Sequence, residues 1–587
     1  METATLDASS PYGCCFVPLV SKALSSRTSF SINSFQTIFY GTDPRCWRNT
    51  CFRSLSSSTK RPSRPCVFPV LATTNLLNGE AIQLSSHFAE YKQLLANTKH
   101  PSKVVCTIGP KTCSFEMIKK LAECGMNVLR MNMSHGTHEW HQQVIDHAKR
   151  LNEDFGWNIG ILLDTKGPEV RSGDLKEPLY VEKGSKFTFT IRRQVEYEPF
   201  TTDVNYDDFV SDVRPGDILL VDGGICSFLV KQVTDVDVIT ECLESGILTS
   251  RRHLNVRGKS ASLPAITEKD WLDIDFGIKN QVDFFALSFV KHEDDVLYLK
   301  DYLLQRGSSA LVISKIESAA AVQRLESILK ASDGAMVARG DLGAEIPIED
   351  VPLVQEEIVH INRRLQKPTI VATHMLESMI TFPSPTRAEV TDVSEAVGQG
   401  ADATMLSGET ASGSFPLEAV RTMCTIATSV WTLFYDRVAN CTLPSPVTPC
   451  SPGDSSVVAL CSSAAFLANH LKARALVVFT KTGKIACSVS AARPRCPILA
   501  FTPDAGLKRR LSLYWGVEAY QIAFSDDPEE TVSTAIDKLK TKSHSPPMFH
   551  HGDLIVVLSD MLGSNGTFVN SVQVRRIKWT TNHYLAE

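Results

Sequence analysis

Short apolar runs alternate with amphipathic helical patterns from about Lys103 onward. One helical pattern is Asp294–Arg306, which Gly307 is placed to end. Its apolar residues Val296, Leu299 and Leu303 fall on one helical face. The alternation predicts a parallel sheet covered by helices, and eight strand–helix units are enough to close a (β/α)8 barrel. The eight apolar runs are Val104–Cys106, Asn127–Met131, Ile159–Leu163, Val282–Leu287, Leu311–Ile313, Gly334–Val337, Thr369–Ala372 and Ala403–Leu406.

Polar and ionisable residues follow each of these apolar runs on its C-terminal side. In a (β/α)8 barrel the C-terminal strand ends meet at one mouth, so residues that are distant in sequence are predicted to lie together. An open doubly wound sheet also places chemistry at strand ends and is the alternative architecture. The polar segments are Thr107, Arg130–His135, Asp164–Arg171, Ser288–Lys291, Lys315–Glu317, Ala338–Asp341, Ala372–His374 and Ser407–Thr410.

The connection over residues 172–260 is far longer than the ~2–6 residues usual between a strand and a helix. Its β-rich pattern predicts an inserted all-β lid, a β-barrel that excludes water from the mouth. A second α/β unit follows a break at Thr442–Asp454, with strands predicted at Ala475–Thr480, Ile498–Thr502, Ala519–Ala523, Leu554–Ser559 and Ser571–Ile577. The predicted parts are a leader (1–75), the barrel (76–171 and 261–437), the lid (172–260) and a C-terminal α/β domain (438–587) for effectors or oligomerisation. The lid strands are predicted at Lys186–Arg192, Ile218–Val221, Ser227–Val233 and Asp237–Glu241.

The first 70 residues differ from the rest of the chain in charge and composition. They contain 8 Lys or Arg, 3 acidic residues and 20 Ser or Thr, whereas the whole chain has a net charge of −5. A Ser-rich, Arg-bearing, acid-poor leader is typical of an organelle transit peptide, and an ordinary N-terminal tail is the alternative.

The remaining composition excludes several classes of protein. The longest apolar runs have about five residues, far below the ~18 that span a bilayer, so no membrane helix is predicted. The negative net charge argues against nucleic acid as the main partner. No Cys-x-x-Cys pair occurs among the 16 cysteines, which argues against zinc-knuckle and thioredoxin-like sites.

Lys315, Glu317 and Asp341 lie at the ends of neighbouring predicted strands. Two carboxylates with open coordination positions suit Mg²⁺, and Lys315 points the same way as Glu317 because strand side chains alternate. Metal and ammonium together would face developing negative charge. A purely structural Lys–Glu ion pair is the alternative. Gly340 precedes Asp341 in a turn that opens a helix, where backbone N–H groups can approach an anion.

Two further strand ends carry candidate groups. Arg130 suits a phosphate group, which it can bind through two hydrogen bonds. Thr373 could relay a proton or could simply be a favourable residue at a strand end, whereas His374 is expected only to form hydrogen bonds. Oxygen ligands of low total charge suit a monovalent cation, although such residues also cap helices. These oxygen-bearing residues are Asn132, Ser134, Asp164 and Thr165.

Together these segments closely resemble the pyruvate kinase family, and the resemblance runs from about Lys103 to the C-terminus, roughly 480 residues. The leader and the segments Val221–Gly224 and Ser250–Gly258 most resemble the plastid isozymes. The segments that carry the resemblance are Lys103–Pro110, Arg130–Gly136, Asp164–Arg171, Ser314–Ser318, Met336–Gly343, Ala372–Ser378, Pro385–Glu389 and Met405–Thr410.

The resemblance implies transfer of the phosphoryl group of phosphoenolpyruvate to ADP, which gives pyruvate and ATP, a step of glycolysis in the plastid (chloroplast) stroma. It implies Mg²⁺ or Mn²⁺, K⁺ and a homo- or hetero-oligomer of pyruvate kinase subunits. The implied catalytic residues are Arg130, Lys315 and Thr373, and the implied substrate-binding residues also include Gly340 and Asp341. The implied ligands are Glu317 and Asp341 for Mg²⁺; Asn132, Ser134, Asp164 and Thr165 for K⁺; and His135 and Arg171 for the nucleotide.

Single positions refine or weaken the resemblance. Glu169 stands where K⁺-dependent members have Glu and K⁺-independent members have Lys, which implies K⁺ dependence. Gly223 replaces the second Asp of the usual Val-Asp-Asp-Gly segment, and His374 replaces a usual Gln or Asn. Thr480–Lys484 is similar to the family's sugar-bisphosphate loop, but Ser559–Ser564 replaces the usual Thr-Gly-Trp-Arg stretch, so a fructose bisphosphate effector is not supported.

Two other functions remain open from the sequence. The first is a regulatory, weakly active subunit of a plastid pyruvate kinase hetero-oligomer, although none of the charged residues expected to be lost from a silent subunit is missing. The second is another metal-dependent barrel enzyme that acts on a keto or enol acid, such as an aldolase-like lyase. Such a lyase would have no use for Arg130 or the inserted lid.

Overall fold

A computed structural model of the 587-residue chain describes residues 101–193, 197–221, 224–258, 264–438, 455–541, 549–562 and 568–578. The predicted leader (1–75), Gly223 and the break at Thr442–Asp454 lie outside these residues.

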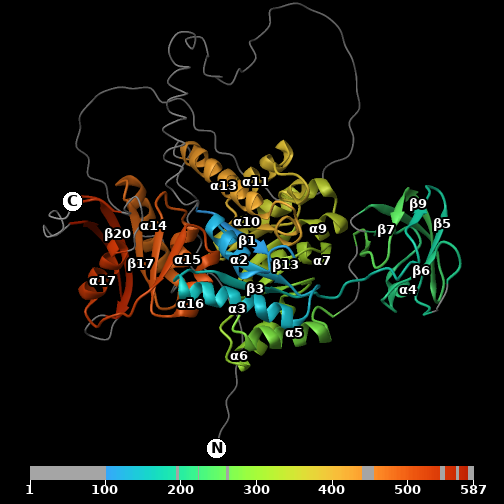
Figure 1. Ribbon diagram of the computed structural model, residues 1–587, viewed down its shortest axis with the longest axis horizontal. Helices are drawn as coiled ribbons and strands as arrows, with labels where there is room; N and C mark the ends of the chain where they lie inside the picture. The colour runs from blue at the N-terminus through green and yellow to red at the C-terminus, as the bar shows by residue number, and fades with distance from the viewer. Residues whose placement is uncertain are drawn as a thin grey trace, which may run out of the picture. The chain divides into compact units, whose positions relative to one another are not determined.

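Eight parallel strands form a closed barrel with the order β1-β16-β15-β14-β13-β12-β3-β2 (Figure 1). Each of the eight predicted apolar runs coincides with one of these strands, so the barrel is confirmed and the open sheet is excluded. The strands are β1 (Lys103–Thr107), β2 (Val128–Asn132), β3 (Gly160–Asp164), β12 (Phe284–Leu287), β13 (Leu311–Ile316), β14 (Gly334–Ala338), β15 (Thr369–Ala372) and β16 (Ala403–Leu406).

Helices cover the outside of the barrel, and several begin at side-chain caps. Ser114, Thr137, Thr267 and Thr386 each accept a backbone N–H from the first turn of the helix that they precede. The helices between and after the strands are α2 (Phe115–Cys124), α3 (His138–Asp154), α5 (Glu268–Lys279), α6 (Glu293–Gln305), α7 (Ala319–Gln323), α8 (Leu325–Ala331), α9 (Arg339–Glu345), η1 (Ile348–Asp350), α10 (Val351–Arg364), η2 (Glu377–Ile380), α11 (Arg387–Gln399), α12 (Gly408–Ala411) and α13 (Pro416–Val438).

The alternation of side chains along the barrel strands determines which residues point into the barrel mouth. One buried cluster takes one or two residues from every strand, including Val105, Val128 and Ile313, and it fills the barrel interior. Their neighbours along the strands, such as Val104 and Leu129, belong to the layer between strands and helices. Because the side-chain period is two, the inward series continues toward the C-terminal strand ends into polar residues. These inward continuations are Thr107, Arg130, Asp164, Ser288 and Lys315.

The inserted lid is all-β apart from one short helix and has its own core. Its described strands pair as a six-stranded sheet, β11-β7-β8-β9-β5-β6, and a two-stranded sheet, β10-β4, rather than as the single closed barrel that we expected. Among the described residues, the edge strands β11 and β6 do not pair with each other, and β4 and β10 form their own ribbon. Phe187, Phe189 and Phe228 pack together in the core. The elements are β4 (Leu179–Val181), β5 (Lys186–Thr190), β6 (Thr201–Asp203), α4 (Phe209–Asp212), β7 (Ile218–Val221), β8 (Cys226–Val233), β9 (Asp237–Glu244), β10 (Gly246–Leu248) and β11 (Leu254–Val256).

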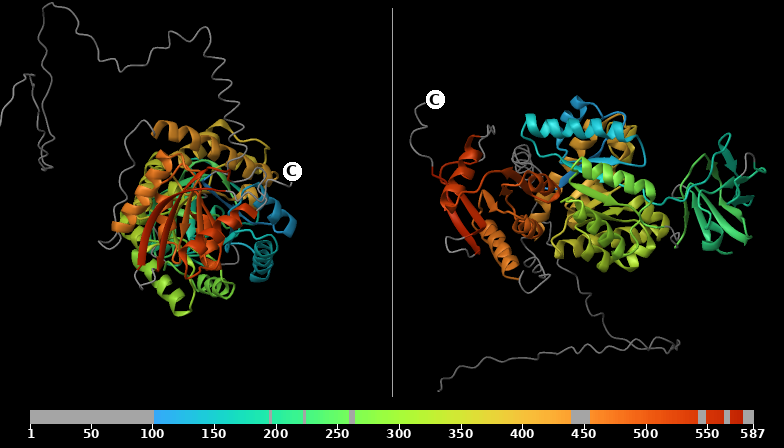
Figure 2. Two further views of the ribbon diagram at one scale, coloured as in Figure 1. Left: turned by 90° about the vertical axis from the view of Figure 1, so that its left-hand side faces the viewer. Right: turned by 90° about the horizontal axis from the view of Figure 1, so that it is seen from below.

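The C-terminal α/β domain is a five-stranded sheet with the order β19-β18-β17-β20-β21, in which only β21 is antiparallel to its neighbour. The sheet twists, as the left view of Figure 2 shows. Separate apolar clusters cover its two faces, one with α14 and α15 and the other with α17. The elements are α14 (Ser455–His470), β17 (Ala475–Phe479), α15 (Lys484–Ala491), β18 (Ile498–Thr502), α16 (Ala505–Arg510), η3 (Leu511–Leu513), β19 (Val517–Gln521), α17 (Pro528–Thr541), β20 (Leu554–Leu562) and β21 (Phe568–Arg576).

Among the described residues, no helix is long and apolar enough to cross a membrane.

Candidate active site

The Asp164 carboxylate is the centre of a buried polar network at the barrel mouth. Arg130 donates to Asp164 Oδ2 through Nε at 2.7 Å, and its Nη1 donates to Thr107 Oγ1 at 2.9 Å. The Lys315 ammonium lies 3.2 Å from the other carboxylate oxygen, Oδ1. Burial alone raises the pKa of Asp164, but Arg130 and Lys315 together bring that pKa below its ordinary value. Asp164 therefore stays ionised and fixes two cationic side chains.

Lys315 lies between two carboxylates and a hydroxyl. Its Nζ is 3.2 Å from Asp164 Oδ1 and 3.3 Å from Glu317 Oε2, and it donates to Ser288 Oγ at 2.8 Å. Burial alone lowers the pKa of Lys315, but the two carboxylates reverse this effect and raise it above the ordinary value. Lys315 is thus a permanent cation, which can stabilise negative charge but is a poor general base.

The two oxygens of Glu317 differ in their partners: Oε2 has the Lys315 ammonium 3.3 Å away, but within the described part of the chain only Oε1 accepts a hydrogen bond. The backbone N–H of Phe289 donates to its Oε1 at 2.7 Å, whereas no group in the described part of the chain donates a hydrogen bond to its buried Oε2. Burial raises the pKa of Glu317, Lys315 opposes the increase and Asp341 adds to it, so the pKa reaches about 7. A buried carboxylate oxygen without a donor fits a place for a cation.

Asp341 lies in the first turn of α9, the helix that follows β14. Its Oδ1 is 3.5 Å from the Nδ1 atom of His253, and about a third of the Asp341 side chain is exposed. His253 pairs with Arg171 in an isolated β-bridge where the two chain connections between barrel and lid run side by side, a segment that we call the lid hinge. Among the described residues no group of three His, Cys, Asp or Glu side chains forms a complete metal cage. A two-carboxylate site is what Mg²⁺ uses when substrate oxygens and water complete its shell.

Thr373 and Gly340 are joined directly. The Gly340 N–H donates to Thr373 Oγ1 at 2.8 Å, and that hydroxyl donates to the carbonyl of Ala372 at 2.6 Å. Thr373 and His374 follow β15 with φ of 68° and 53°, which places both in the left-handed region. His374 is exposed, whereas Thr373 is half-buried beside the helix that carries Asp341.

The four candidate K⁺ ligands come from the ends of β2 and β3. Asn132 and Asp164 are register partners on these adjacent strands, and the Ser134 N–H donates to Asn132 Oδ1 at 3.1 Å. Thr165 Oγ1 accepts the Ser288 N–H at 3.1 Å. Amide, hydroxyl and carboxylate oxygens are therefore gathered there, and they suit a hard cation of low charge.

The two candidate nucleotide residues lie outside this network. His135 is exposed, and its carbonyl accepts from the His141 ring at 2.8 Å. Arg171 lies at the lid hinge, where its Nε donates to Glu169 Oε2 at 2.7 Å and its Nη1 donates to the carbonyl of Arg251 at 2.8 Å. Glu169 thus holds a hinge arginine in this structure.

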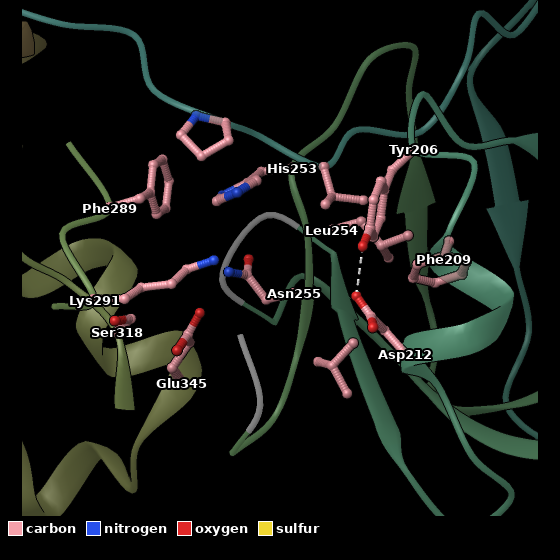
Figure 3. Close-up of a pocket in the computed structure, with 13 residues that line it drawn as sticks. Tyr206, Phe209, Asp212, His253, Leu254, Asn255, Phe289, Lys291, Ser318 and Glu345 are labelled. Carbon is pink, nitrogen blue, oxygen red and sulfur yellow. Dashed lines mark hydrogen bonds between the residues drawn. The ribbon is translucent and has the colours of Figure 1, made fainter. Parts of the chain in front are cut away.

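A cavity of about 290 Å³ lies between residues of the lid and of the barrel (Figure 3), and its lining includes Ser318, the neighbour of Glu317. Lys291 and Glu345 face it from the barrel, and Tyr206 and Asp212, joined by a 2.7 Å hydrogen bond, face it from the lid. The lining thus combines charged and hydroxyl groups from both parts of the chain.

The geometry is that of a site for an anionic substrate, and comparison with known proteins identifies the family. Residues 99–420 match the family model "Pyruvate kinase, barrel domain" and residues 458–575 match "Pyruvate kinase, alpha/beta domain". The chain belongs to the pyruvate kinase family. Pyruvate kinases transfer a phosphoryl group from phosphoenolpyruvate to ADP, and this chain has that activity.

Several named pyruvate kinases are similar to the chain over most of its length. Pyruvate kinase isozyme G, chloroplastic, of Nicotiana tabacum is 53% identical over 448 residues, which cover 76% of this chain and 78% of that protein. Plastidial pyruvate kinase 2 of Arabidopsis thaliana is 52% identical over 445 residues, 75% of each chain. The pyruvate kinase of Staphylococcus haemolyticus is 40% identical over 477 residues, 79% of each chain. Members of the family generally use Mg²⁺ and K⁺.

Two residues that contact the site of this pyruvate kinase are not among those predicted from its sequence. Ser288 had been noted only as part of a polar strand end, yet its Oγ accepts from Lys315 and donates to the Thr165 carbonyl at 2.6 Å. Arg339 had been read as part of a glycine-containing turn, yet its guanidinium contacts the Thr373 backbone. The signal for Ser288 was its inward register; nothing in the local pattern indicated a partner for Arg339.

Proposed function

We propose that this pyruvate kinase carries out phosphoryl transfer at the C-terminal mouth of its barrel, with Lys315 as the central catalytic cation. The observation that supports this most directly is the position of the Lys315 ammonium, within 3.3 Å of both Asp164 and Glu317. Three fixed contacts preorganise this charge, which therefore needs no reorganisation when negative charge develops on the phosphoryl group and the enolate.

Glu317 and Asp341 are the proposed Mg²⁺ ligands, with Mn²⁺ able to take its place. The fit rests on the buried Oε2 atom of Glu317, which accepts no hydrogen bond from the described residues, and on the repulsion between the two carboxylates, which a divalent cation would relieve. When bound, the ion supplies Lewis-acid stabilisation of phosphoryl and carboxylate oxygens. Asn132, Ser134, Asp164 and Thr165 are the proposed K⁺ ligands.

The other site residues orient the substrates and move a proton. Arg130 binds the transferring phosphoryl group while Asp164 and Thr107 fix the plane of its guanidinium. The Gly340–Asp341 backbone and Thr373 bind phosphoenolpyruvate, and Thr373 lies in the route that protonates the enolate. His135 and Arg171 contact the nucleotide when the lid closes.

Replacing Lys315 tests the proposal. K315M is expected to lower kcat by about a thousandfold or more, because it removes the buried cation proposed to stabilise negative charge on the phosphoryl group and the enolate. The assay couples pyruvate release from phosphoenolpyruvate and ADP to NADH oxidation. K330M is the matched control, because Lys330 forms an exposed ion pair with Glu326 in α8. If K315M turned over as fast as K330M, Lys315 would have no part in the mechanism.

The K⁺ site is tested by changing the monovalent cation. Replacing K⁺ by tetramethylammonium, at constant ionic strength, is expected to abolish most activity because that ion is too large for oxygen coordination in this cluster. Retained activity would contradict the four proposed ligands. T165V, which keeps the shape but not the hydroxyl, is expected to raise the K⁺ concentration needed for half-maximal rate.

We also propose that the enzyme acts in the plastid stroma, as one subunit type of a homo- or hetero-oligomer of pyruvate kinase subunits. The Ser-rich leader and the relatives named chloroplastic or plastidial support this location. The complete set of site charges favours a catalytic subunit over a regulatory one. Turnover by the purified chain alone decides between them, because a regulatory subunit needs a partner for full activity.

A further inference from the structure

The turn that carries Thr373 is strained. Thr373 and His374 both have positive φ, 68° and 53°, although neither is glycine. A β-branched residue is a genuine outlier in this region, so the surrounding structure must impose the conformation. In this conformation Thr373 Oγ1 accepts the Gly340 N–H at 2.8 Å.

One guanidinium contacts the carbonyl groups of the whole turn. Arg339 Nη2 donates to the carbonyl of Thr373 at 2.6 Å and to that of His374 at 3.2 Å, and Nε donates to the carbonyl of Ala372 at 3.3 Å. The Arg339 side chain is only 10% exposed. Three successive carbonyls that converge on one cation are therefore held in the orientation that positive φ produces.

The guanidinium is itself fixed by a carboxylate from another helix. Asp392, in α11, accepts from Arg339 Nη1 at 2.6 Å and from Nη2 at 2.8 Å. The paired contacts define the plane of the guanidinium. A lysine could not reproduce this arrangement, because its ammonium cannot donate in a planar fork to a carboxylate and three carbonyls.

We propose that Arg339 and Asp392 are a positioning pair that holds the left-handed Thr373–His374 turn and so places the Thr373 hydroxyl for proton delivery to the enolate. The inference rests on the role proposed above for Thr373. Arg339 adjoins Gly340, and both neighbours bind the turn. The Arg339 guanidinium donates to the backbone carbonyl of Thr373, and the Gly340 N–H donates to the Thr373 hydroxyl. Neither member of the pair needs to touch the substrate.

The experiment measures enolate protonation separately from phosphoryl transfer. Exchange of the methyl hydrogens of pyruvate with solvent deuterium, followed by NMR with Mg²⁺, K⁺ and ATP present, reports the proton transfer alone. R339K is expected to slow this exchange at least about tenfold while changing the KM for phosphoenolpyruvate less than about twofold. R493K is the matched control, because Arg493 is also a buried arginine in an ion pair, 3.0 Å from Asp402 at the opposite end of the barrel.

A double-mutant cycle shows whether Arg339 acts through Thr373. In the T373A background, R339K is expected to slow the exchange by less than about a further twofold, because the hydroxyl that Arg339 positions is already absent. The positioning role would be overturned if the two substitutions slowed the exchange independently, so that their fold-changes multiplied in the double variant. It would also be overturned if R339K alone left the exchange rate unchanged. Normal exchange in T373A would instead overturn the role of Thr373 itself. If R339K fails to fold, D392N decides: slower exchange supports the pair, and wild-type exchange refutes it.

Discussion

Buried charges at the barrel mouth determine how the site responds to pH. Burial raises the pKa of Glu317, Lys315 lowers it and Asp341 raises it further, to about 7, compared with its ordinary value of 4.5. Between these two values the unfolded chain has released a proton that the metal-free folded protein still holds. Glu317 therefore makes the metal-free protein less stable as pH rises from 4.5 toward 7, and its ionised form is destabilised until a cation binds.

This shift predicts the pH dependence of metal affinity. A metal ion binds the carboxylate form, so the Mn²⁺ affinity of the substrate-free protein is expected to rise about tenfold per pH unit up to about pH 7 and then to level off. Electron paramagnetic resonance of free Mn²⁺ measures this affinity. In K315M the levelling should move to higher pH, because the ammonium that lowers the Glu317 pKa is absent. A flat profile from pH 5.5 to 8 would contradict the shift.

Ser288 is predicted to fix the Lys315 ammonium. S288A removes the hydroxyl that accepts from Lys315 Nζ at 2.8 Å, and kcat is expected to fall about tenfold, with a smaller change in KM. Steady-state kinetics measures both constants. S314A is the control: Ser314 precedes Lys315 and is buried, but its hydroxyl contacts Ser332 in the helix layer. Equal losses of turnover in the two variants would mean that Ser288 has only a structural role.

At the scale of elements, the barrel was predictable because its strands are apolar on both faces. Each strand packs inward on the barrel interior and outward on helices, so every position from Lys103 to Thr107 is buried. The lid was harder because β4, β6, β10 and β11 have only three residues each, too few for an alternating pattern. The Arg339–Asp392 contact joins residues 53 positions apart on different helices, which no local pattern can indicate.

The separate lid core predicts separate unfolding of the lid. F228A removes a buried ring that packs on Phe187 and Phe189, at a cost of about 3–5 kcal/mol in the free energy of unfolding. Calorimetry is expected to resolve a low-temperature lid transition, with turnover lost and Mn²⁺ affinity retained by the barrel carboxylates. Y180A is the control: the Tyr180 ring of the lid is 61% exposed, so this variant should unfold at the same temperature as the wild-type protein. A parallel loss of Mn²⁺ affinity in F228A would contradict independent cores.

At the scale of the whole molecule, the barrel and the C-terminal domain are joined by buried charge pairs and by the start of β1. Arg493 lies 3.0 Å from Asp402, and Arg509 lies 2.9 Å from Asp283. Lys103 Nζ donates to the carbonyl of Val517 at 2.7 Å, and the Pro101 carbonyl accepts the Gly516 N–H at 2.8 Å. The folded unit therefore needs the chain from about Pro101 onward.

This requirement turns the predicted leader into a truncation experiment. A chain that begins at Asn75 retains the contacts of Pro101 and Lys103 and is expected to have the turnover and Tm of the full-length protein. A chain that begins at Val104 loses both contacts with the C-terminal domain, and its Tm should fall by about 1 °C for each kcal/mol lost in a folded unit of this size. Circular dichroism and the coupled assay compare the three proteins. Unfolding of the Asn75 chain would show that residues before it belong to the folded enzyme rather than to a removable leader, because truncation there leaves every described contact in place.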